Sequence, residues 1–233
     1  MRAVILAAGK GQRMLPLTLS VPKPLLRIAD KTILDYIFES FPEEIDSVII
    51  VVGYLKKKIQ QYLGAKYQGR PIHYITQDVL DGSATALLTC RDLFMPKERL
   101  LVVYGDELPN QEEIFACLNH KYSWLCCPTD NPSQSGIATI DEKGYITEVV
   151  EKPENPSSKM SAAGIMVINS DIFNYEPIQH SNGEYYLSSL MGKFLKDYQI
   201  KAVFGRKRPP FISPDEIEKL TIEQYQKVNK SQL

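Results

Sequence analysis

A loop with two glycines follows the first apolar segment of the chain, and an arginine ends it. Residues 8–13 read AGKGQR and come directly after the apolar run at 3–7. Backbone N–H groups in such a loop can face an anion, and the guanidinium of Arg13 offers a fork of donors suited to phosphate oxygens. These residue types at this spacing point to a ligand with several negative charges, such as the phosphates of a nucleotide.

Two lysines lie near this glycine loop (residues 8–13), in different settings. Lys23 stands between Pro22 and Pro24, and because proline restrains the backbone, the Lys23 ammonium is held with less freedom than most. Lys10 lies at the tip of the loop, where water can solvate it. A tight turn with solvated cations is the alternative interpretation of a lone glycine pair. The clustering of loop, arginine and restrained lysine favours a phosphate site.

Two familiar phosphate-binding motifs do not fit the glycine loop. A P-loop needs a Gly-Lys-Ser/Thr triplet after four further residues, and a dinucleotide-binding loop needs a third glycine where Met14 stands. Pro16, Pro22 and Pro24 also prevent a helix from starting directly after the loop. A dinucleotide-dependent oxidoreductase is therefore disfavoured.

Segments 6–14 (LAAGKGQRM), 16–18 (PLT) and 22–25 (PKPL) together resemble the signature of the sugar-1-phosphate nucleotidylyltransferases. This family includes glucose-1-phosphate thymidylyltransferases and UTP–glucose-1-phosphate uridylyltransferases. The resemblance implies that the loop wraps around a nucleoside triphosphate and that Arg13 and Lys23 are catalytic, stabilising the reacting α-phosphate. It also implies a set of nucleotide-binding residues in and before the loop: Leu6, Ala7, Ala8, Gly9, Gly11 and Arg13.

A later segment resembles the part of these enzymes that recognises the base. Residues 77–86 read QDVLDGSATA, and the resemblance implies that Gln77 hydrogen-bonds a pyrimidine while Gly82 lies against it. A side-chain amide supplies both a donor and an acceptor, as a uracil or thymine edge requires. The alternative is that Gln77 is an ordinary polar loop residue and that Gly82 only begins a helix.

A carboxylate follows the apolar run at 100–105. Asp106 stands in the sequence YGDE and would protrude at the ligand-binding edge of a parallel sheet. Mg²⁺ that bridges phosphates usually takes one or two protein carboxylates. The resemblance implies that Asp106 is the metal ligand on the nucleotide side, and the expected cofactor is Mg²⁺.

The second half of the chain contains positions that resemble the sugar side of the family. The resemblance implies that Lys152 meets the phosphate of a sugar 1-phosphate, that Glu151 meets a sugar hydroxyl and that two glycines leave room for the ring. The implied sugar-phosphate-binding residues are Gly136, Glu151, Lys152 and Gly164. Glu-Lys-Pro alone is also typical of a solvated turn.

The chain departs from the family near its C-terminus. The family supplies a second metal-binding aspartate late in the chain, and in the corresponding stretch at 208–216 (RPPFISPDE) Pro210 falls at that position. Three interpretations stay open. Asp215 substitutes from a shifted loop, Asp106 and water hold Mg²⁺ with the substrate phosphates, or the chain binds nucleotide without catalysing a reaction.

Positioning these residues requires a sheet, and the apolar pattern predicts one. Runs without polar alternation, separated by amphipathic segments, indicate a mostly parallel sheet covered on both faces, which binds ligands outside the carboxyl ends of its strands. The expected strands are at 3–7, 47–53, 72–76, 100–105, 123–127, 163–168 and 200–205, and a hairpin spans 137–153. The expected helices are at 32–41 (with a capping box formed by Thr32 and Asp35), 54–64, 83–94, 184–198 and 214–228.

The predicted fold class is α/β, with a Rossmann-like, mixed and mostly parallel sheet and helices on both faces. Together with the resemblance, this predicts the nucleotide-diphospho-sugar transferase type of fold. We expect one nucleotidyltransferase domain over 1–233, with a nucleotide-binding half at 1–120, a sugar-binding half at 121–205 and a C-terminal helix at 206–233.

The composition limits the classes of protein to which the chain can belong. The 233 residues are 44% apolar and 24% charged with a net charge of −1, so we expect a globular protein with no nucleic-acid partner. No apolar run approaches the length of a membrane span. The cysteines match no zinc motif and are expected to be reduced core residues of a cytoplasmic protein: Cys90, Cys117, Cys126 and Cys127. Assembly into a homo-oligomer is left open.

The predicted activity is transfer of a nucleotidyl group from UTP or dTTP to a sugar 1-phosphate, with glucose 1-phosphate as the first candidate. The products would be a nucleotide sugar and pyrophosphate. One alternative is a CTP- or GTP-dependent enzyme that acts on another phosphorylated sugar or alcohol. The other is a non-catalytic paralogue that binds nucleotide sugars. The sequence leaves the sugar and the choice between UTP and dTTP open.

Overall fold

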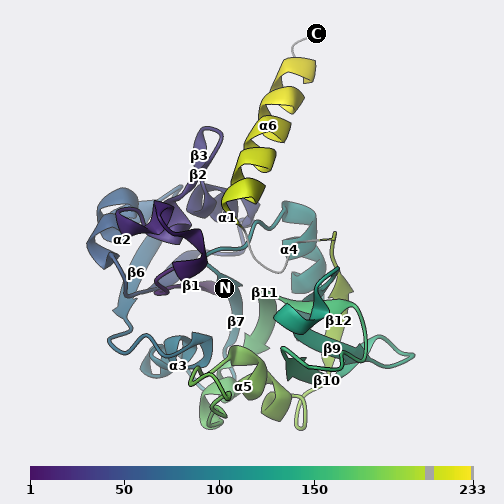
Figure 1. Cartoon of the computed structure of the whole chain (residues 1–233). Coiled ribbons are helices and arrows are strands. Elements are labelled where there is room, and N and C mark those ends of the chain that lie inside the picture. The colour runs from purple at the N-terminus through teal and green to yellow at the C-terminus, as the bar shows by residue number, and fades with distance from the viewer. Residues whose placement is uncertain (208–212, 232–233) are drawn as a thin grey trace.

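The computed structural model describes residues 1–207 and 213–231, and their side chains as far as residue 223. Within these residues a ten-stranded sheet runs through the molecule in the order β5-β6-β4-β1-β7-β11-β8-β12-β10-β9 (Figure 1). Its strands are β1 (Arg2–Ala7), β4 (Ser47–Val52), β5 (Lys66–Tyr67), β6 (Arg70–Thr76), β7 (Arg99–Tyr104), β8 (Ser123–Pro128), β9 (Gly136–Ile140), β10 (Tyr145–Glu151), β11 (Met160–Asn169) and β12 (Ile200–Phe204). A separate two-stranded ribbon contains β2 (Arg27–Ile28) and β3 (Lys31–Thr32).

The parallel strands are gathered in the first half of the chain. β6, β4, β1 and β7 run in the same direction, with Val4 level with Ile49 on one side and Val102 on the other. Side chains of β1 enter the core on both faces of the sheet, since Ile5 joins one apolar cluster and Val4 the other, and both are completely buried. This two-sided burial explains why these strands lack polar alternation.

The second half of the sheet is mostly antiparallel. β11 pairs antiparallel with both β7 and β8, and β10 forms an antiparallel hairpin with β9. The predicted hairpin is confirmed, and its turn contains Gly144 with a φ of 76°. β12 lies parallel to β8. The predicted mixed α/β fold with a central sheet is therefore confirmed. Within this sheet, parallel pairing predominates in the first half of the chain and antiparallel pairing in the second, with β5–β6 and β12–β8 as the exceptions.

Helices cover both faces of the sheet, as predicted. α1 (Ile33–Ser40), α2 (Lys56–Leu63) and α4 (Gln111–Leu118) contribute to one apolar cluster, and α3 (Ser83–Leu88) and α5 (Leu187–Phe194) to the other. Figure 1 shows these two groups on opposite sides of the sheet. The last helix, α6 (Pro214–Ser231), packs Ile217 and Leu220 against the first cluster and then projects away from the body of the molecule.

The ends of the helices show where the start and stop positions predicted from the sequence were right and where they were wrong. The capping box of α1 is confirmed: Asp35 N–H donates to Thr32 Oγ1 at 3.2 Å, and Thr32 N–H donates to Asp35 Oδ2 at 2.7 Å. The helix predicted at 83–94 was too long, because α3 ends at Leu88 and a separate 3₁₀ turn follows. The helix predicted at 184–198 was also too long at both ends.

One helix was missed by the sequence analysis. α4 begins with a capping box in which Asn110 accepts from the Glu113 N–H and Glu113 accepts from the Asn110 N–H. An asparagine followed three residues later by glutamate is a recognisable start signal. The signal was therefore present in the sequence.

The cysteines agree with the prediction. All four are buried and carry free thiols, and burial raises the pKa of Cys90 to about 12. Among the residues whose placement is described, no helix has the length and apolar character required to span a membrane.

Candidate active site

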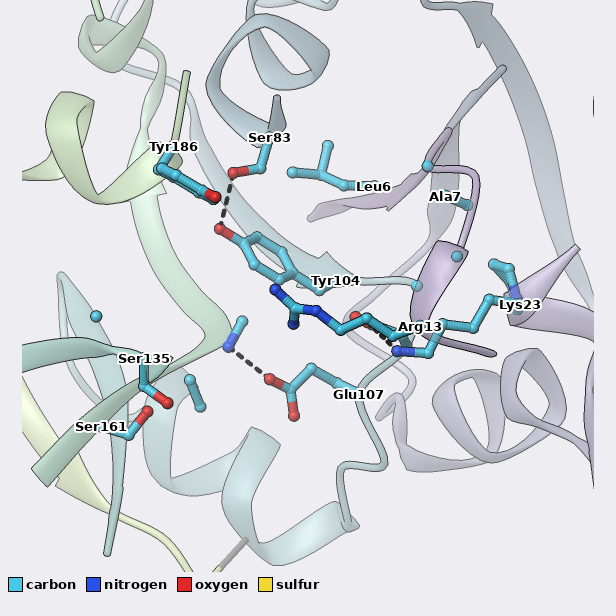
Figure 2. A pocket seen from close by; sticks show the side chains of 18 of the residues that line it. Leu6, Ala7, Arg13, Lys23, Ser83, Tyr104, Glu107, Ser135, Ser161 and Tyr186 are labelled. Carbon is cyan, nitrogen blue, oxygen red and sulfur yellow. Dashed lines mark hydrogen bonds and ion pairs between the residues drawn. The ribbon is translucent and has the colours of Figure 1, made fainter. Parts of the chain in front are cut away.

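A cavity of about 870 Å³ opens at the carboxyl ends of β1, β6 and β7 (Figure 2). Every site residue predicted from the sequence lines it: Leu6, Ala7, Ala8, Gly9, Gly11, Arg13, Lys23, Gln77, Gly82, Asp106, Gly136, Glu151, Lys152 and Gly164. These residues come from both halves of the chain. The structure thus brings the predicted residues together, while their roles in binding and catalysis stay predictions.

The glycine loop packs directly on the segment that carries Lys23. Gly11 has a φ of 62°, in the left-handed region, and a Cβ there would lie 3.1 Å from the Lys23 Cβ and 3.0 Å from Thr18 Cγ2. Thr18 Oγ1 in turn donates to the Gly11 carbonyl at 2.9 Å. A side chain at position 11 would therefore be strained and would push the loop away from Lys23. At Gly9 a Cβ would meet no atom within 4 Å.

Lys23 and Asp106 form an ion pair at the centre of this end of the cavity. Lys23 begins a 3₁₀ turn, η3 (Lys23–Leu25), and its Nζ lies 2.7 Å from Asp106 Oδ2. The Lys23 side chain is 11% exposed and that of Asp106 is 39% exposed. Burial alone would raise the pKa of Asp106, but Lys23, with a smaller contribution from Arg13, holds that pKa below its usual range. The carboxylate is therefore ionised and stands among cations.

Arg13 completes the cationic end of the cavity. It lies in η1 (Gln12–Met14), directly after the glycine loop, and its side chain points into the cavity (Figure 2). Met14 in the same turn is completely buried, so it anchors the turn that presents the guanidinium. Loop backbone, guanidinium and ammonium thus surround a space suited to a polyanion.

Gln77 and Gly82 lie together at the end of β6 and the start of α3. Gln77 is 5% exposed as a whole residue, and its Nε2 donates to the Gly82 carbonyl at 3.1 Å. Gly82 has a φ of 143°, and a Cβ at this position would lie 2.1 Å from the carbonyl oxygen of Tyr185. Gly82 is therefore required by the close approach of the Tyr185 backbone, whatever its contact with a base.

Glu151 and Lys152 lie at the other end of the cavity. Glu151 Oε2 accepts from Ser188 Oγ at 2.8 Å, and Glu151 Oε1 is 4.0 Å from Lys152 Nζ. Lys152 Nζ also lies 4.1 Å from the centre of the Tyr186 ring and hydrogen-bonds the Tyr186 hydroxyl. Burial raises the pKa of Glu151 above its ordinary value, although Ser188 and Lys152 act in the opposite direction. The lysine is thus held in place by two neighbours.

The two sugar-side glycines are both close to other side chains. A Cβ at Gly164 would lie 2.4 Å from Tyr104 Cγ, and a Cβ at Gly136 would lie 3.1 Å from Glu151 Oε2. The Gly164 N–H donates to Glu107 Oε1 at 2.7 Å, a contact drawn in Figure 2. The prediction assigned these glycines to leaving room for a sugar ring. At Gly164 the structure gives a second reason, which is the packing of Tyr104.

Sequence reasoning missed several residues that line the same cavity. Polar and aromatic examples are Ser83, Tyr104, Glu107, Ser135, Ser161, Tyr186 and Ser188, and α6 adds Glu216, Lys219, Leu220 and Glu223. Of these, Tyr104 and Glu107 stand in the motif YGDE, Ser83 in QDVLDGSATA and Glu216 in RPPFISPDE, but no role was predicted for them. The Ser135 hydroxyl is buried and has no hydrogen-bond partner in the described part of the chain. A substrate hydroxyl at this point would supply one.

Asp106 lies at the cationic end, where the metal is expected. Asp106 is a hard oxygen donor that remains partly exposed beside the space for phosphates, which fits Mg²⁺ held mainly by substrate phosphates and water. Among the side chains described, those of residues 1–207 and 213–223, no group of three or more His, Cys, Asp or Glu could hold a metal ion. Pro210 lies outside the described residues. Asp215 is exposed, and its neighbour Glu216 is the residue that lines the cavity.

Comparison with known proteins gives the same class of enzyme. The family model described as nucleotidyl transferase matches residues 2–206. The bifunctional protein GlmU of Methanocaldococcus jannaschii is 34% identical over 206 residues, covering 87% of this chain and 49% of that protein. The UTP–glucose-1-phosphate uridylyltransferase AglF of Haloferax volcanii is 34% identical over 211 residues, covering 84% of each chain. The chain spans about half the length of the bifunctional relatives it matches.

Solved structures share the fold. A UDP-glucose pyrophosphorylase complexed with UDP-glucose superimposes with a TM-score of 0.84 at 23% identity, covering 97% of this chain and 98% of that one. A putative glucose-1-phosphate thymidylyltransferase from Bacillus anthracis, in complex with sucrose, gives a TM-score of 0.79 at 23% identity, covering 96% and 94%. At this level of identity the likeness concerns the fold alone.

Proposed function

The chain belongs to the nucleotidyl transferase family, and on this premise we propose that it transfers a nucleotidyl group from UTP or dTTP to a sugar 1-phosphate. Glucose 1-phosphate is the first candidate for the sugar. The products are a nucleotide sugar and pyrophosphate. The name of the related AglF supports this choice of substrates.

One observation carries the proposal: two separate cationic groups face one cavity. Arg13 and the Lys23–Asp106 pair lie at the end formed by the glycine loop, and Lys152 lies with Glu151 at the other end. A transferase that joins two phosphates must bring two anions together against their repulsion. A cavity with one cationic group at each end is suited to this task.

The reaction is an in-line phosphoryl transfer. An oxygen of the sugar phosphate attacks the α-phosphorus of the triphosphate, a P–O bond forms, and the bond from the α-phosphorus to the oxygen bridging to the β-phosphate breaks as pyrophosphate leaves. A phosphate nucleophile is already anionic near neutral pH, so no general base is required. Catalysis then consists of positioning and charge neutralisation.

The residues of the cavity divide this work. Lys152 holds the attacking phosphate, Lys23 stabilises the charge that develops at the α-phosphate, and Arg13 neutralises the departing pyrophosphate. Asp106 would hold Mg²⁺, which when bound supplies further positive charge to the triphosphate. In the unliganded protein Asp106 also keeps the Lys23 ammonium in place, so this cation is positioned before substrate arrives.

The remaining expectations form part of the proposal and rest on the sequence. They are the division into a nucleotide-binding half at 1–120 and a sugar-binding half at 121–205, a cytoplasmic location, and no nucleic-acid or membrane partner. Assembly into a homo-oligomer stays open.

A substrate matrix tests the proposed function. The purified chain is incubated with Mg²⁺, each common nucleoside triphosphate and a panel of sugar 1-phosphates, and pyrophosphate release is measured. Release with UTP or dTTP and glucose 1-phosphate is the expected result. Release only with CTP or GTP would shift the proposal to the alternative nucleotide, and nucleotide binding without release under any combination would favour a non-catalytic binding protein.

A further inference from the structure

We propose that Thr85 and Asp81 fix the orientation of the Gln77 amide, and that this orientation makes the chain select a base with an N–H donor, uracil or thymine, over cytosine. The inference rests on the proposed function, in which Gln77 meets the base. Thr85 is not among the residues that line the cavity. It is therefore a positioning residue that acts through Gln77.

The nitrogen end of the Gln77 amide is fixed by two neighbours. Gln77 Nε2 lies 3.1 Å from the Gly82 carbonyl oxygen and 3.0 Å from Thr85 Oγ1. A carbonyl oxygen can only accept a hydrogen bond. The Gly82 contact therefore requires the NH₂ group, and not the amide oxygen, to face the start of α3.

The Thr85 hydroxyl can both donate and accept a hydrogen bond, so its other neighbours decide which it does toward Gln77. Thr85 Oγ1 lies 2.5 Å from Asp81 Oδ1 and 3.0 Å from the Gly82 carbonyl. Both of these neighbours are acceptors, so the single hydroxyl hydrogen is directed to one of them and the lone pairs of Thr85 are left to accept from Gln77. Turning the amide by 180° would place the Gln77 oxygen against the Gly82 carbonyl and the Asp81 carboxylate, and Thr85 could donate to that oxygen only by giving up its own acceptor.

The oxygen end of the Gln77 amide is left for the ligand. Gln77 lines the cavity, and among the described residues no donor is recorded for its Oε1. Gln77 Oε1 is not among the buried atoms without a partner, so this oxygen is open to the cavity, where a ligand that brings a donor can bind it. The protein thus presents an acceptor, fixed from behind, to whatever base enters.

The chemistry of the bases then decides the selection. Uracil and thymine carry a hydrogen on N3, whereas N3 of cytosine carries a lone pair. An acceptor on the protein facing N3 forms a hydrogen bond with uracil and repels cytosine. Loss of one hydrogen bond with an unpaired acceptor left behind corresponds to about a ten- to a hundredfold difference in affinity.

The test measures the dissociation constants of UDP and CDP by calorimetry in the wild-type chain and in variants. Wild type is expected to bind UDP at least about tenfold more tightly than CDP. Thr85→Val keeps the shape of the side chain, removes the hydroxyl and is expected to reduce this ratio several-fold. Thr85→Ser restores the hydroxyl and is expected to restore the ratio. Asp81→Ala, which frees the Thr85 hydroxyl to donate to Gln77, is expected to lower the ratio by a second route.

Thr89→Val is the matched control. Thr89 lies just after α3, is exposed, and donates its hydroxyl to the Ala86 carbonyl at 2.7 Å, so the same substitution should leave the UDP-to-CDP ratio unchanged. A wild-type ratio near one, or an unchanged ratio in both Thr85→Val and Asp81→Ala, would overturn the inference. Because binding is measured without turnover, absence of pyrophosphate release would reject the proposed function and would leave this test intact.

Discussion

Lys23 and Asp106 stabilise each other in the free protein and act on different groups in the proposed reaction. The ammonium is nearly buried and the carboxylate is partly exposed, at an Nζ to Oδ2 distance of 2.7 Å. A nearly buried cation without a counter-ion is costly, so the pair fixes the Lys23 side chain where a phosphate would meet it. A substrate phosphate can then replace Asp106 as the partner of Lys23, or bind Lys23 together with Asp106.

The roles of the pair predict the kinetics of its variants. Removing one positioned charge from a phosphoryl-transfer site costs about a hundred- to a thousandfold in rate, so Lys23→Ala and Asp106→Ala should each lower pyrophosphate release by at least this amount while circular dichroism shows a folded chain. Lys66→Ala, at an exposed lysine in β5, should keep wild-type turnover. Normal turnover in both pair variants would reject the assigned roles.

We expect the charged form of Glu151 to lower the stability of the fold, although the proposed function uses this side chain. Burial raises the pKa of this carboxyl group in the folded chain, so the folded state binds the Glu151 proton more tightly than the unfolded state does. The stability that this proton supplies is fully present below the unfolded pKa and is lost as pH rises through the folded pKa. Above the folded pKa the charged carboxylate is therefore a cost to stability.

Glu151→Gln removes this titration. Its melting temperature should exceed that of wild type at pH 8, and the difference should shrink toward zero as the pH falls to about 4, while the KM for the sugar 1-phosphate rises. Thermal melts of both proteins across this pH range provide the measurement. A difference that is constant with pH, or that grows toward acid, would show that burial does not raise the pKa of Glu151.

Single residues differ in how far the sequence could predict their place. Every predicted site residue lines the cavity. Some could be found because their motifs follow strands directly, as the glycine loop follows β1 and Gln77 follows β6. Tyr186 and Ser135 could not be found in this way. Tyr186 comes from a segment that only tertiary packing brings to Lys152, and Ser135 is notable for an unpartnered buried hydroxyl, which no local pattern announces.

At the scale of elements, the site depends on β11 packing against β7. Their antiparallel register places Ile165 beside Val103, and Gly164, the residue before it, leaves space for the Tyr104 ring. Tyr104 in turn donates to Ser83 Oγ at 3.2 Å, at the start of α3. One small residue thus allows a strand from each half of the chain and a helix to meet at the cavity.

Gly164→Ala tests this packing. The new Cβ would lie 2.4 Å from Tyr104 Cγ, so the ring must move, and overpacking of this kind should lower the free energy of unfolding by about 1–3 kcal/mol. Gly192→Ala is the matched control, because Gly192 lies inside α5 and a Cβ there meets no atom within 4 Å. It should stabilise the chain by about 0.5–1 kcal/mol. Chemical denaturation measures both changes, and equal effects at the two glycines would contradict the packing argument.

Element boundaries were less predictable than element types. The periodicity over 83–94 continued past Leu88, where the backbone changes to 3₁₀ geometry, and apolar spacing does not distinguish the two forms. α4 was missed although its capping box is readable, because its apolar pattern is weak and only three of its residues are apolar and buried: Ile114, Cys117 and Leu118.

At the scale of the whole molecule, one continuous sheet carries both ends of the cavity. The parallel strands could be predicted because burial on both faces leaves an unbroken apolar pattern. The strand order of the second half could not. Nothing local specifies that β11 inserts between β7 and β8, or that β12 lies between β8 and β10, because these neighbours are set by contacts between segments far apart in the chain.

The central claim is that the cationic end at Arg13 and Lys23 holds the nucleotide phosphates and that Lys152 holds the sugar phosphate within one cavity. A crystal structure of the chain with UDP-glucose tests this most directly. We predict the uracil beside Gln77, the diphosphate between Lys23 and Lys152, and the glucose against Glu151. Density for the ligand outside this cavity, or with its diphosphate remote from both lysines, would contradict the claim.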